Sequence, residues 1–249
     1  MATDPRTEAE LIADLLPEAS ARVVRTVDAF HDGDWSAPSL LPTWTRAHVV
    51  AHLALNSEGM ARALRGVLGE VEESGQESGV GTMYDSDAVR DADIAELAAA
   101  EHSEIRGRLL AGVTVLQDVI SVVPTDRWQT RLERTPGGRS IRATSFLGMR
   151  WRELEIHHVD LAAGYTTADW TPEFAEHLLD AMVRRVAAEA IEIRPLDSAR
   201  TWVLGGGESE YPVPVVTGPA ADIGWWLTGR PAPDTVSCSH GELPPIEGW

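Results

Sequence analysis

The chain has 249 residues, of which 43% are apolar, so it can bury a sizeable core in one large domain or two of ordinary size. It has a single cysteine, no apolar run of membrane-spanning length and a first stretch unlike a signal peptide; these features exclude a disulfide scaffold and predict a cytoplasmic protein. The net charge is −18 and lysine is absent, which argues against nucleic acid or an anionic membrane as a partner.

The first part of the chain shows apolar periodicity typical of helices. A first helix is expected over about Thr7–Phe30, with Pro17 starting or kinking it. A second helix is expected over about Thr45–Leu68, with Thr45 as its N-cap. Residues 69–81 are rich in Gly, Glu and Ser and predict a flexible surface loop.

Two further helical regions follow. Asp85–Ser86 caps a third region that runs to Val123 with one possible break. Residues 124–142 predict a hairpin or an irregular crossover, and a fourth helix is expected over about Ala143–Ala163. Four long helices predict a four-helix bundle in residues 1–165, a usual place for sites built from inward-facing side chains.

Residues 166–249 show a different pattern and predict a smaller α+β domain. A helix is expected over about Pro172–Ile193, followed by short alternating stretches. The expected strands are Thr201–Leu204, Val213–Val216 and Thr235–Ser239, with a short helix over Pro219–Thr228.

Polar side chains recur at helical spacing in the predicted fourth helix. Glu153, His157 and Asp160 share one stripe of this helix. Trp151 and Leu154 fall on a different, apolar stripe, so the helix can pack and still present polar groups. A carboxylate and an imidazole one turn apart can reach the same cation, but a third ligand must then come from another segment.

The predicted second helix offers that ligand. His48 and His52 lie one turn apart among apolar residues. One of them, with Glu153 and His157, would give a His₂–carboxylate site with open positions, which is typical of catalytic rather than structural zinc. Alternatively, these histidines are core or capping residues satisfied by their neighbours, and spacing alone leaves both interpretations open.

Longer patterns resemble a known family. The chain contains Leu41-x-x-Trp44-Thr45-Arg46-x-His48-x-x-x-His52-x-x-x-Asn56, Met83-Tyr84-x-Ser86 with Arg90, Arg152-Glu153-x-x-Ile156-His157-x-Val159-Asp160-Leu161, and Trp226-Leu227-Thr228-Gly229-Arg230. In these motifs it resembles the mycothiol-dependent maleylpyruvate isomerases of actinobacteria, over nearly its whole length. The resemblance implies a DinB-like four-helix bundle and a C-terminal α+β domain related to sterol carrier proteins.

The resemblance also implies particular cofactors and site residues. A divalent metal, zinc or another, is expected on His52, Glu153 and His157, with mycothiol as the second cofactor. Arg90 and Arg230 match positions linked to activity, and they would clamp the carboxylates of a small anionic substrate. His48 matches a position that is not a ligand and is expected to pack or to lie behind the ligands. Asp160, one turn beyond His157, would orient a ligand histidine or pair with an arginine.

The implied reaction is the isomerisation of maleylpyruvate to fumarylpyruvate. A thiolate that adds to the cis alkene leaves a single bond, which rotates, and elimination then gives the trans isomer. Coordination to zinc deprotonates a thiol at neutral pH. The alternatives are a mycothiol S-transferase of detoxification or natural-product biosynthesis, and a non-enzymatic metal-binding regulatory module. The protein is expected to be a monomer or a weak oligomer.

Three other features receive a minor role. Cys238 lies two residues from His240, but neighbours in an alternating strand rarely form a catalytic pair, so a core thiol is expected. The pair Trp225–Trp226 is expected to fill a core or an interdomain contact. Glu155 and His158 stand where the family usually has apolar or small residues, and we expect them to alter the neighbouring surface and, with residues 69–85, to influence specificity.

Overall fold

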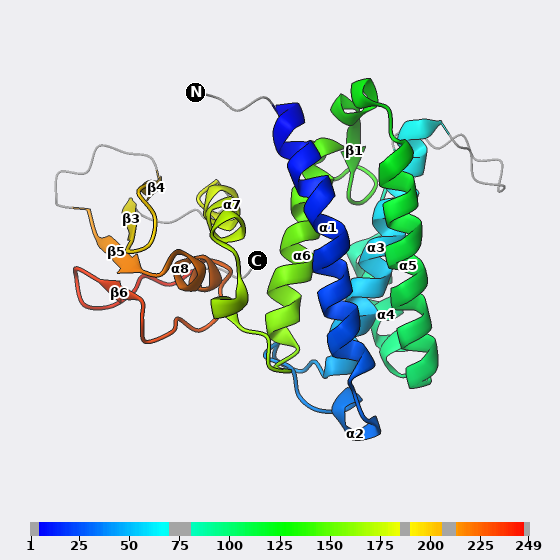
Figure 1. Ribbon diagram of the computed structural model, residues 1–249, viewed down its shortest axis with the longest axis horizontal. Coiled ribbons are helices and arrows are strands. Elements are labelled where there is room, and N and C mark those ends of the chain that lie inside the picture. The colour runs from blue at the N-terminus through cyan, green and yellow to red at the C-terminus, as the bar shows by residue number, and fades with distance from the viewer. Residues whose placement is uncertain (1–4, 70–80, 185–189, 206–212, 247–249) are drawn as a thin grey trace. The chain divides into compact units, whose positions relative to one another are not determined.

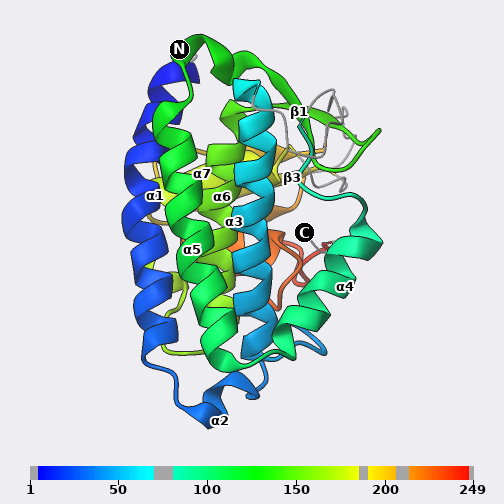
Figure 2. The same ribbon diagram turned by 90° about the vertical axis from the view of Figure 1, so that its right-hand side faces the viewer.

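Four long helices lie side by side in the N-terminal part of the computed structural model (Figures 1 and 2). They are α1 (Pro5–Asp28), α3 (Arg46–Leu68), α5 (His102–Val122) and α6 (Thr144–Asp160). Both α1 and α3 pack against α5 and α6, so the four helices close into a bundle, as predicted. The structure describes residues 5–69, 81–184, 190–205 and 213–246, and the chain divides at Gly164 into two units.

Shorter elements complete the first unit. They are α2 (Asp32–Trp35), α4 (Asp87–Ala98), a 3₁₀ turn η1 (Thr125–Gln129), β1 (Arg131–Glu133) and β2 (Ser140–Arg142). The third predicted helical region is therefore two helices, and the expected break lies between α4 and α5. β1 and β2 form the hairpin that was one of the two expectations for this stretch. α4 packs on the outside of α3. The predicted loop lies almost entirely outside the described residues.

Capping residues mark where helices α3 and α4 begin and where α3 ends. Thr45 is the N-cap of α3, and Gly69 closes the helix in the left-handed region with a φ of 77°. The hydroxyl of Ser86 accepts a hydrogen bond from the N–H of Val89 at 3.1 Å and so begins α4. Pro17 lies within α1 rather than at its start.

The bundle core follows the helical period. α1 buries Ile12, Leu16, Val23 and Val27, which recur every three to four residues or at a multiple of that spacing. Full burial of one such aliphatic side chain contributes about 1.5–3 kcal/mol. The described helices include none that combines the length and apolarity needed to cross a membrane.

In its described residues, the second unit combines two α-helices with a four-stranded sheet. Its elements are η2 (Thr167–Asp169), α7 (Pro172–Met182), β3 (Ile191–Pro195), β4 (Trp202–Leu204), β5 (Val215–Gly218), α8 (Ala220–Leu227) and β6 (Ser237–Cys238). The strand order is β4-β3-β5-β6, in which β3 and β5 are parallel and the other pairs antiparallel. α7 packs against α8.

The predicted helix over Pro172–Ile193 is wrong in its second half. α7 ends at Met182, and Ile191 and Ile193 belong to β3. These two isoleucines are almost fully buried, while Glu192 and Arg194 between and after them are not, which is the period-two pattern of a strand. β-branched residues fit that pleated surface better than the interior of a helix.

Candidate metal centre

Two histidines and a carboxylate meet where α3 and α6 face each other. Nε2 of His52 lies 2.8 Å from Oε2 of Glu153. Nε2 of His157 lies 3.2 Å from the same oxygen. One ligand atom from each residue lies within 4.8 Å of the other two. The structure therefore brings together the three residues that the sequence singles out as candidate ligands, and we call them the metal cluster.

The packing of α6 explains why these polar groups point inward. Glu153 and His157 are one turn apart on the face of α6 that meets His52 of α3. Leu154 and Ile156 on the other faces are fully buried, so the helix is surrounded by protein on several sides. A helix packed all round has no solvent-facing side for its polar residues, which must find partners inside the bundle.

Asp160 holds the ring of His157 from behind. Its Oδ2 lies 2.8 Å from Nδ1 of His157, and the residue is fully buried. Because an ionised carboxylate can only accept, Nδ1 carries the proton and donates it. The lone pair of the neutral ring is then on Nε2, which faces Glu153. Nδ1 of His52 has no hydrogen-bond partner among the described residues, so only one of the two rings is held in this way.

The cluster shifts the acidity of its own members. Burial would raise the pKa of Glu153, but hydrogen bonds with His157 and His52 outweigh it and hold that pKa well below its usual range. Burial lowers the pKa of His52, and its hydrogen bond with Glu153 offsets only part of this effect. Burial also acts to lower the pKa of His157, but hydrogen bonds with Asp160 and Glu153 prevail and raise it.

The donor set fits a divalent metal. Neutral His157 presents a lone pair to a carboxylate oxygen of Glu153, and two acceptors in contact need a cation between them. That cation is a proton or a metal ion. Two imidazole nitrogens and one carboxylate oxygen are ligands that zinc accepts, and three protein ligands leave positions open for another molecule.

His48 does not join the cluster. Its Nδ1 lies 2.8 Å from the hydroxyl of Thr45 and accepts a hydrogen bond from the N–H of Thr45 at 3.3 Å, which completes the cap of α3. Its ring stacks on Trp44 with the centroids 6.1 Å apart. Trp44 also contacts the ring of His52, at 5.8 Å. His48 therefore acts in helix capping and packing, one of the two roles expected for it.

The two candidate arginines lie in different units. Arg90, in the first turn of α4, is close enough to the metal cluster for its charge to lower the pKa of His52, after the larger effect of burial. It pairs with Asp91 at 2.7 Å, and its side chain is 24% exposed. Arg230 belongs to the second unit, where its guanidinium lies 5.0 Å from the ring centroid of Trp225. It follows Gly229, which ends the turn after α8 with a φ of 82°.

The sequence patterns assign no role to three polar residues near the cluster, namely Asn56, Tyr84 and Arg150. Arg150 is 1% exposed and donates a hydrogen bond to Oδ1 of Asn56 at 2.7 Å. Asn56 in turn acts on Tyr84, where it lowers the pKa against the larger opposing effects of burial and of the charge of Glu153. The available signal was spacing, because Arg150 precedes Glu153 by about one turn and Asn56 follows His52 by one turn. The polar stripes of α3 and α6 are therefore longer than the candidate ligands alone.

The expected surface role of Glu155 and His158 is wrong. Both are 3% exposed and point toward α1. Glu155 pairs with Arg22, and Nε2 of His158 lies 2.7 Å from the hydroxyl of Thr26. They lie on a different face of α6 from the cluster, so they connect two bundle helices. Nothing in the sequence distinguishes this interior polar contact from a surface one.

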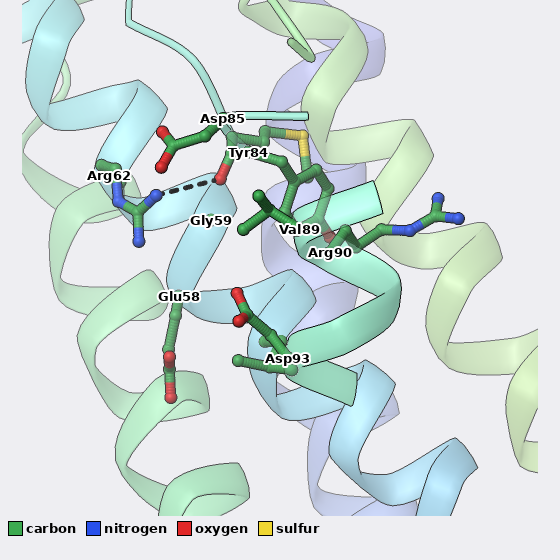
Figure 3. A pocket seen from close by; sticks show the side chains of 10 residues that line it. Glu58, Gly59, Arg62, Tyr84, Asp85, Val89, Arg90 and Asp93 are labelled. Carbon is green, nitrogen blue, oxygen red and sulfur yellow. Dashed lines mark hydrogen bonds between the residues drawn. The ribbon is translucent and has the colours of Figure 1, made fainter. Parts of the chain in front are cut away.

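A pocket of about 90 Å³ lies between α3 and α4 (Figure 3). Its walls include Gly59 and Arg62 from α3, Tyr84 from the segment before α4, and Val89 and Arg90 from α4. None of the three cluster residues lines it. Tyr84 and Arg90 connect the two places, because both line the pocket and both interact electrostatically with the cluster.

Comparisons with known proteins match the chain to two family models and to solved structures. The family model "Mycothiol maleylpyruvate isomerase N-terminal domain" matches residues 16–162, and "MDMPI C-terminal domain" matches residues 169–243. A crystal structure of the mycothiol-dependent maleylpyruvate isomerase is similar, with 26% identity, 97% of each chain covered and a TM-score of 0.82. A histidine-to-alanine mutant of such an isomerase matches with 25% identity and the same coverage and TM-score. No curated protein sequence matches the chain.

Proposed function

The chain belongs to the mycothiol maleylpyruvate isomerase family, and from this premise we propose that it isomerises maleylpyruvate to fumarylpyruvate with a bound divalent metal and mycothiol. The observation that carries the proposal is the convergence of His52, Glu153 and His157 on atoms within 4.8 Å of one another. An enzyme of this kind needs a three-ligand site with open positions, and the donor set here has that composition.

Each cluster residue has a defined task in this proposal. His52, Glu153 and His157 would hold the metal, and Asp160 keeps Nε2 of His157 free to bind by accepting from Nδ1. When bound, zinc and mycothiol would supply a thiolate at neutral pH, able to add reversibly to the conjugated alkene. His52 and His157 are buried, and a site with little access to water would strengthen the electrostatic interactions of a bound anion.

The arginines would recognise the substrate as an anion. Arg90 lies near the cluster, so its guanidinium is suited to a carboxylate or to negative charge that develops during the reaction. Arg230 would supply the second contact. The unfavourable long-range field of a chain of charge −18 makes such short-range contacts necessary for a dianionic substrate.

Product analysis tests the proposal. Purified protein should contain about one zinc per chain. With mycothiol and maleylpyruvate it should give fumarylpyruvate. NMR would detect this isomer, and mass spectrometry would detect any thiol adduct. Omission of mycothiol should abolish turnover, whereas Cys238→Ser should retain it. A stable thiol adduct as the only product would indicate a mycothiol S-transferase, and zinc binding without any turnover would indicate a non-enzymatic module.

A further inference from the structure

Arg150 places a positive charge inside the bundle, where Glu153 of the metal cluster acts on it at a distance but neither of its hydrogen bonds among the described residues goes to a carboxylate. Its hydrogen bonds go to neutral oxygens, Oδ1 of Asn56 at 2.7 Å and the carbonyl of Leu53 at 3.1 Å. Its Nε and Nη2 are buried and have no hydrogen-bond partner within the described part of the chain. Burial lowers the pKa of Arg150 to about 10, so it stays a cation at neutral pH. Such a buried charge is costly, and a bundle could use an apolar residue there instead.

Arg150 determines which group of the Asn56 amide is available to Tyr84. Since Oδ1 of Asn56 accepts from Arg150, the amide has its N–H group to offer to the hydroxyl of Tyr84. The phenolic oxygen then acts as an acceptor toward Asn56, and its own O–H is left to donate elsewhere. That O–H is then available to a molecule bound in the pocket that Tyr84 lines. Burial raises the pKa of Tyr84, and the negative charge of Glu153 adds to the effect, so the group remains a neutral phenol.

The backbone around Tyr84 fixes where this donor lies. The N–H groups of Met83 and Tyr84 both donate to the carbonyl of Arg134, at 3.1 and 3.0 Å. On the other side the segment lies against Gly59, where a Cβ would stand 2.9 Å from the carbonyl oxygen of Met83. The ring lines the pocket together with Arg90 (Figure 3). A rigidly held O–H beside two arginines and a candidate metal site is suited to an anionic acceptor.

We propose that Tyr84 is a catalytic residue that donates a hydrogen bond to the substrate oxygen on which negative charge develops, and that Asn56 and Arg150 are positioning residues that orient its hydroxyl. This inference rests on the proposed function. When a thiolate adds to an alkene conjugated to a carbonyl, the electron pair moves to the carbonyl oxygen, and it returns when the thiolate leaves. Tyr84 keeps its proton throughout and stabilises the oxygen only while the charge is present.

The test compares three variants of the metal-loaded protein with mycothiol and maleylpyruvate. Tyr84→Phe removes the hydroxyl and keeps the ring. Its kcat should fall about 10- to 100-fold while KM stays within about twofold, because the contact is made only as charge develops. Asn56→Ala should lower kcat in the same way. The double variant should be no slower than Tyr84→Phe alone, since Asn56 acts through the hydroxyl. Tyr165→Phe, the same chemical change in the second unit, is the matched control.

Two further measurements separate this inference from the function on which it rests. Zinc content and melting temperature should be the same in Tyr84→Phe and the unmodified protein. A cobalt-substituted sample titrated with 2-mercaptoethanol should show equal thiol affinity in both. Loss of metal or thiol binding in Tyr84→Phe, normal kcat, or multiplicative effects in the double variant would each overturn the assignment. If the unmodified protein shows neither metal binding nor isomerisation, it is the proposed function that fails.

Discussion

At the scale of single residues, the ring of His157 is held at both nitrogens. Asp160 fixes its Nδ1 at 2.8 Å, and Glu153 lies 3.2 Å from Nε2. A candidate ligand held in this way would lose little side-chain freedom when a metal binds. The neighbouring His158, which differs by a single position, instead turns to α1 and contacts Thr26. The two adjacent histidines therefore allow a direct comparison between a cluster residue and a packing residue.

Substituting His157→Ala should remove the metal and the activity together, because two remaining ligands bind zinc far more weakly than three. Zinc content measured by inductively coupled plasma mass spectrometry checks this. His158→Gln is the control, since it retains a polar group toward Thr26 and should keep the metal. Full zinc occupancy in His157→Ala would show that the cluster is not the metal site.

The sequence anticipated the cluster better than its surroundings. Residues one helical turn apart must share a face, so the pairing of Glu153 with His157 followed from spacing alone. Arg150 has a similar spacing, but an arginine is usually a surface residue, and only its 1% exposure reveals it as part of the interior. Which of several faces a buried helix turns to which neighbour depends on packing that one sequence does not display, as Glu155 also shows.

At the scale of elements, the segment before α4 lies unusually close to α3. Three small residues of α3 make this possible. A Cβ on Gly66 would stand 2.9 Å from Cα of Gly81, and one on Gly81 would stand 2.5 Å from the carbonyl oxygen of Ala63. Gly59 meets the carbonyl of Met83 one turn earlier along the same face. We call Gly59, Ala63 and Gly66 the small-residue seam, and it determines where Tyr84 lies.

Gly59→Ala should destabilise the protein by about 1–3 kcal/mol, because the added Cβ meets backbone that cannot rotate away. Activity should fall as well, since the displaced segment carries Tyr84. Gly107→Ala is the control, because a Cβ there meets nothing within 4 Å and alanine is favoured within a helix by about 0.5–1 kcal/mol. Urea unfolding compares the two. Equal stabilities would show that the seam is not a packing requirement.

Helix ends that are specified by neighbouring residues could be predicted from the sequence, whereas a strand that depends on distant partners could not. The N-cap Thr45 and the terminal Gly69 specify the ends of α3 through short-range hydrogen bonds and backbone conformation, so the sequence was sufficient there. The stretch after Met182 carries no such stop signal before Ile191. The strand β3, which begins at Ile191, depends instead on pairing with β4 and β5, which lie later in the chain.

At the scale of the whole molecule, the net charge of −18 opposes the approach of an anionic substrate. Salt should therefore raise kcat/KM for maleylpyruvate, because the screening length shortens from about 30 Å at 0.01 M to about 10 Å at 0.1 M. The change should appear in KM, with kcat nearly constant. Steady-state kinetics over this range checks it. A fall in kcat/KM with salt would show instead that the local field of the arginines outweighs the net charge.

The second unit contributes Arg230 to the proposed substrate contacts. Arg230→Ala should keep its zinc and lose about 10- to 100-fold in kcat/KM, the effect of removing one charge-assisted contact to a carboxylate. Arg194→Ala is the matched control, because that arginine pairs with Glu192 on the exposed side of β3. Near-normal kinetics in Arg230→Ala would show that the bundle alone holds the substrate.

The small-residue seam has a consequence for protein engineering. The chain leaves α3 at Gly69 and is back against that helix at Gly81, so the two ends of the intervening stretch are anchored to one rigid element. Any larger residue at these contacts would push the segment before α4, and Tyr84 with it, away from α3. A label is therefore better attached at a position such as Gly107, where added atoms meet nothing within 4 Å.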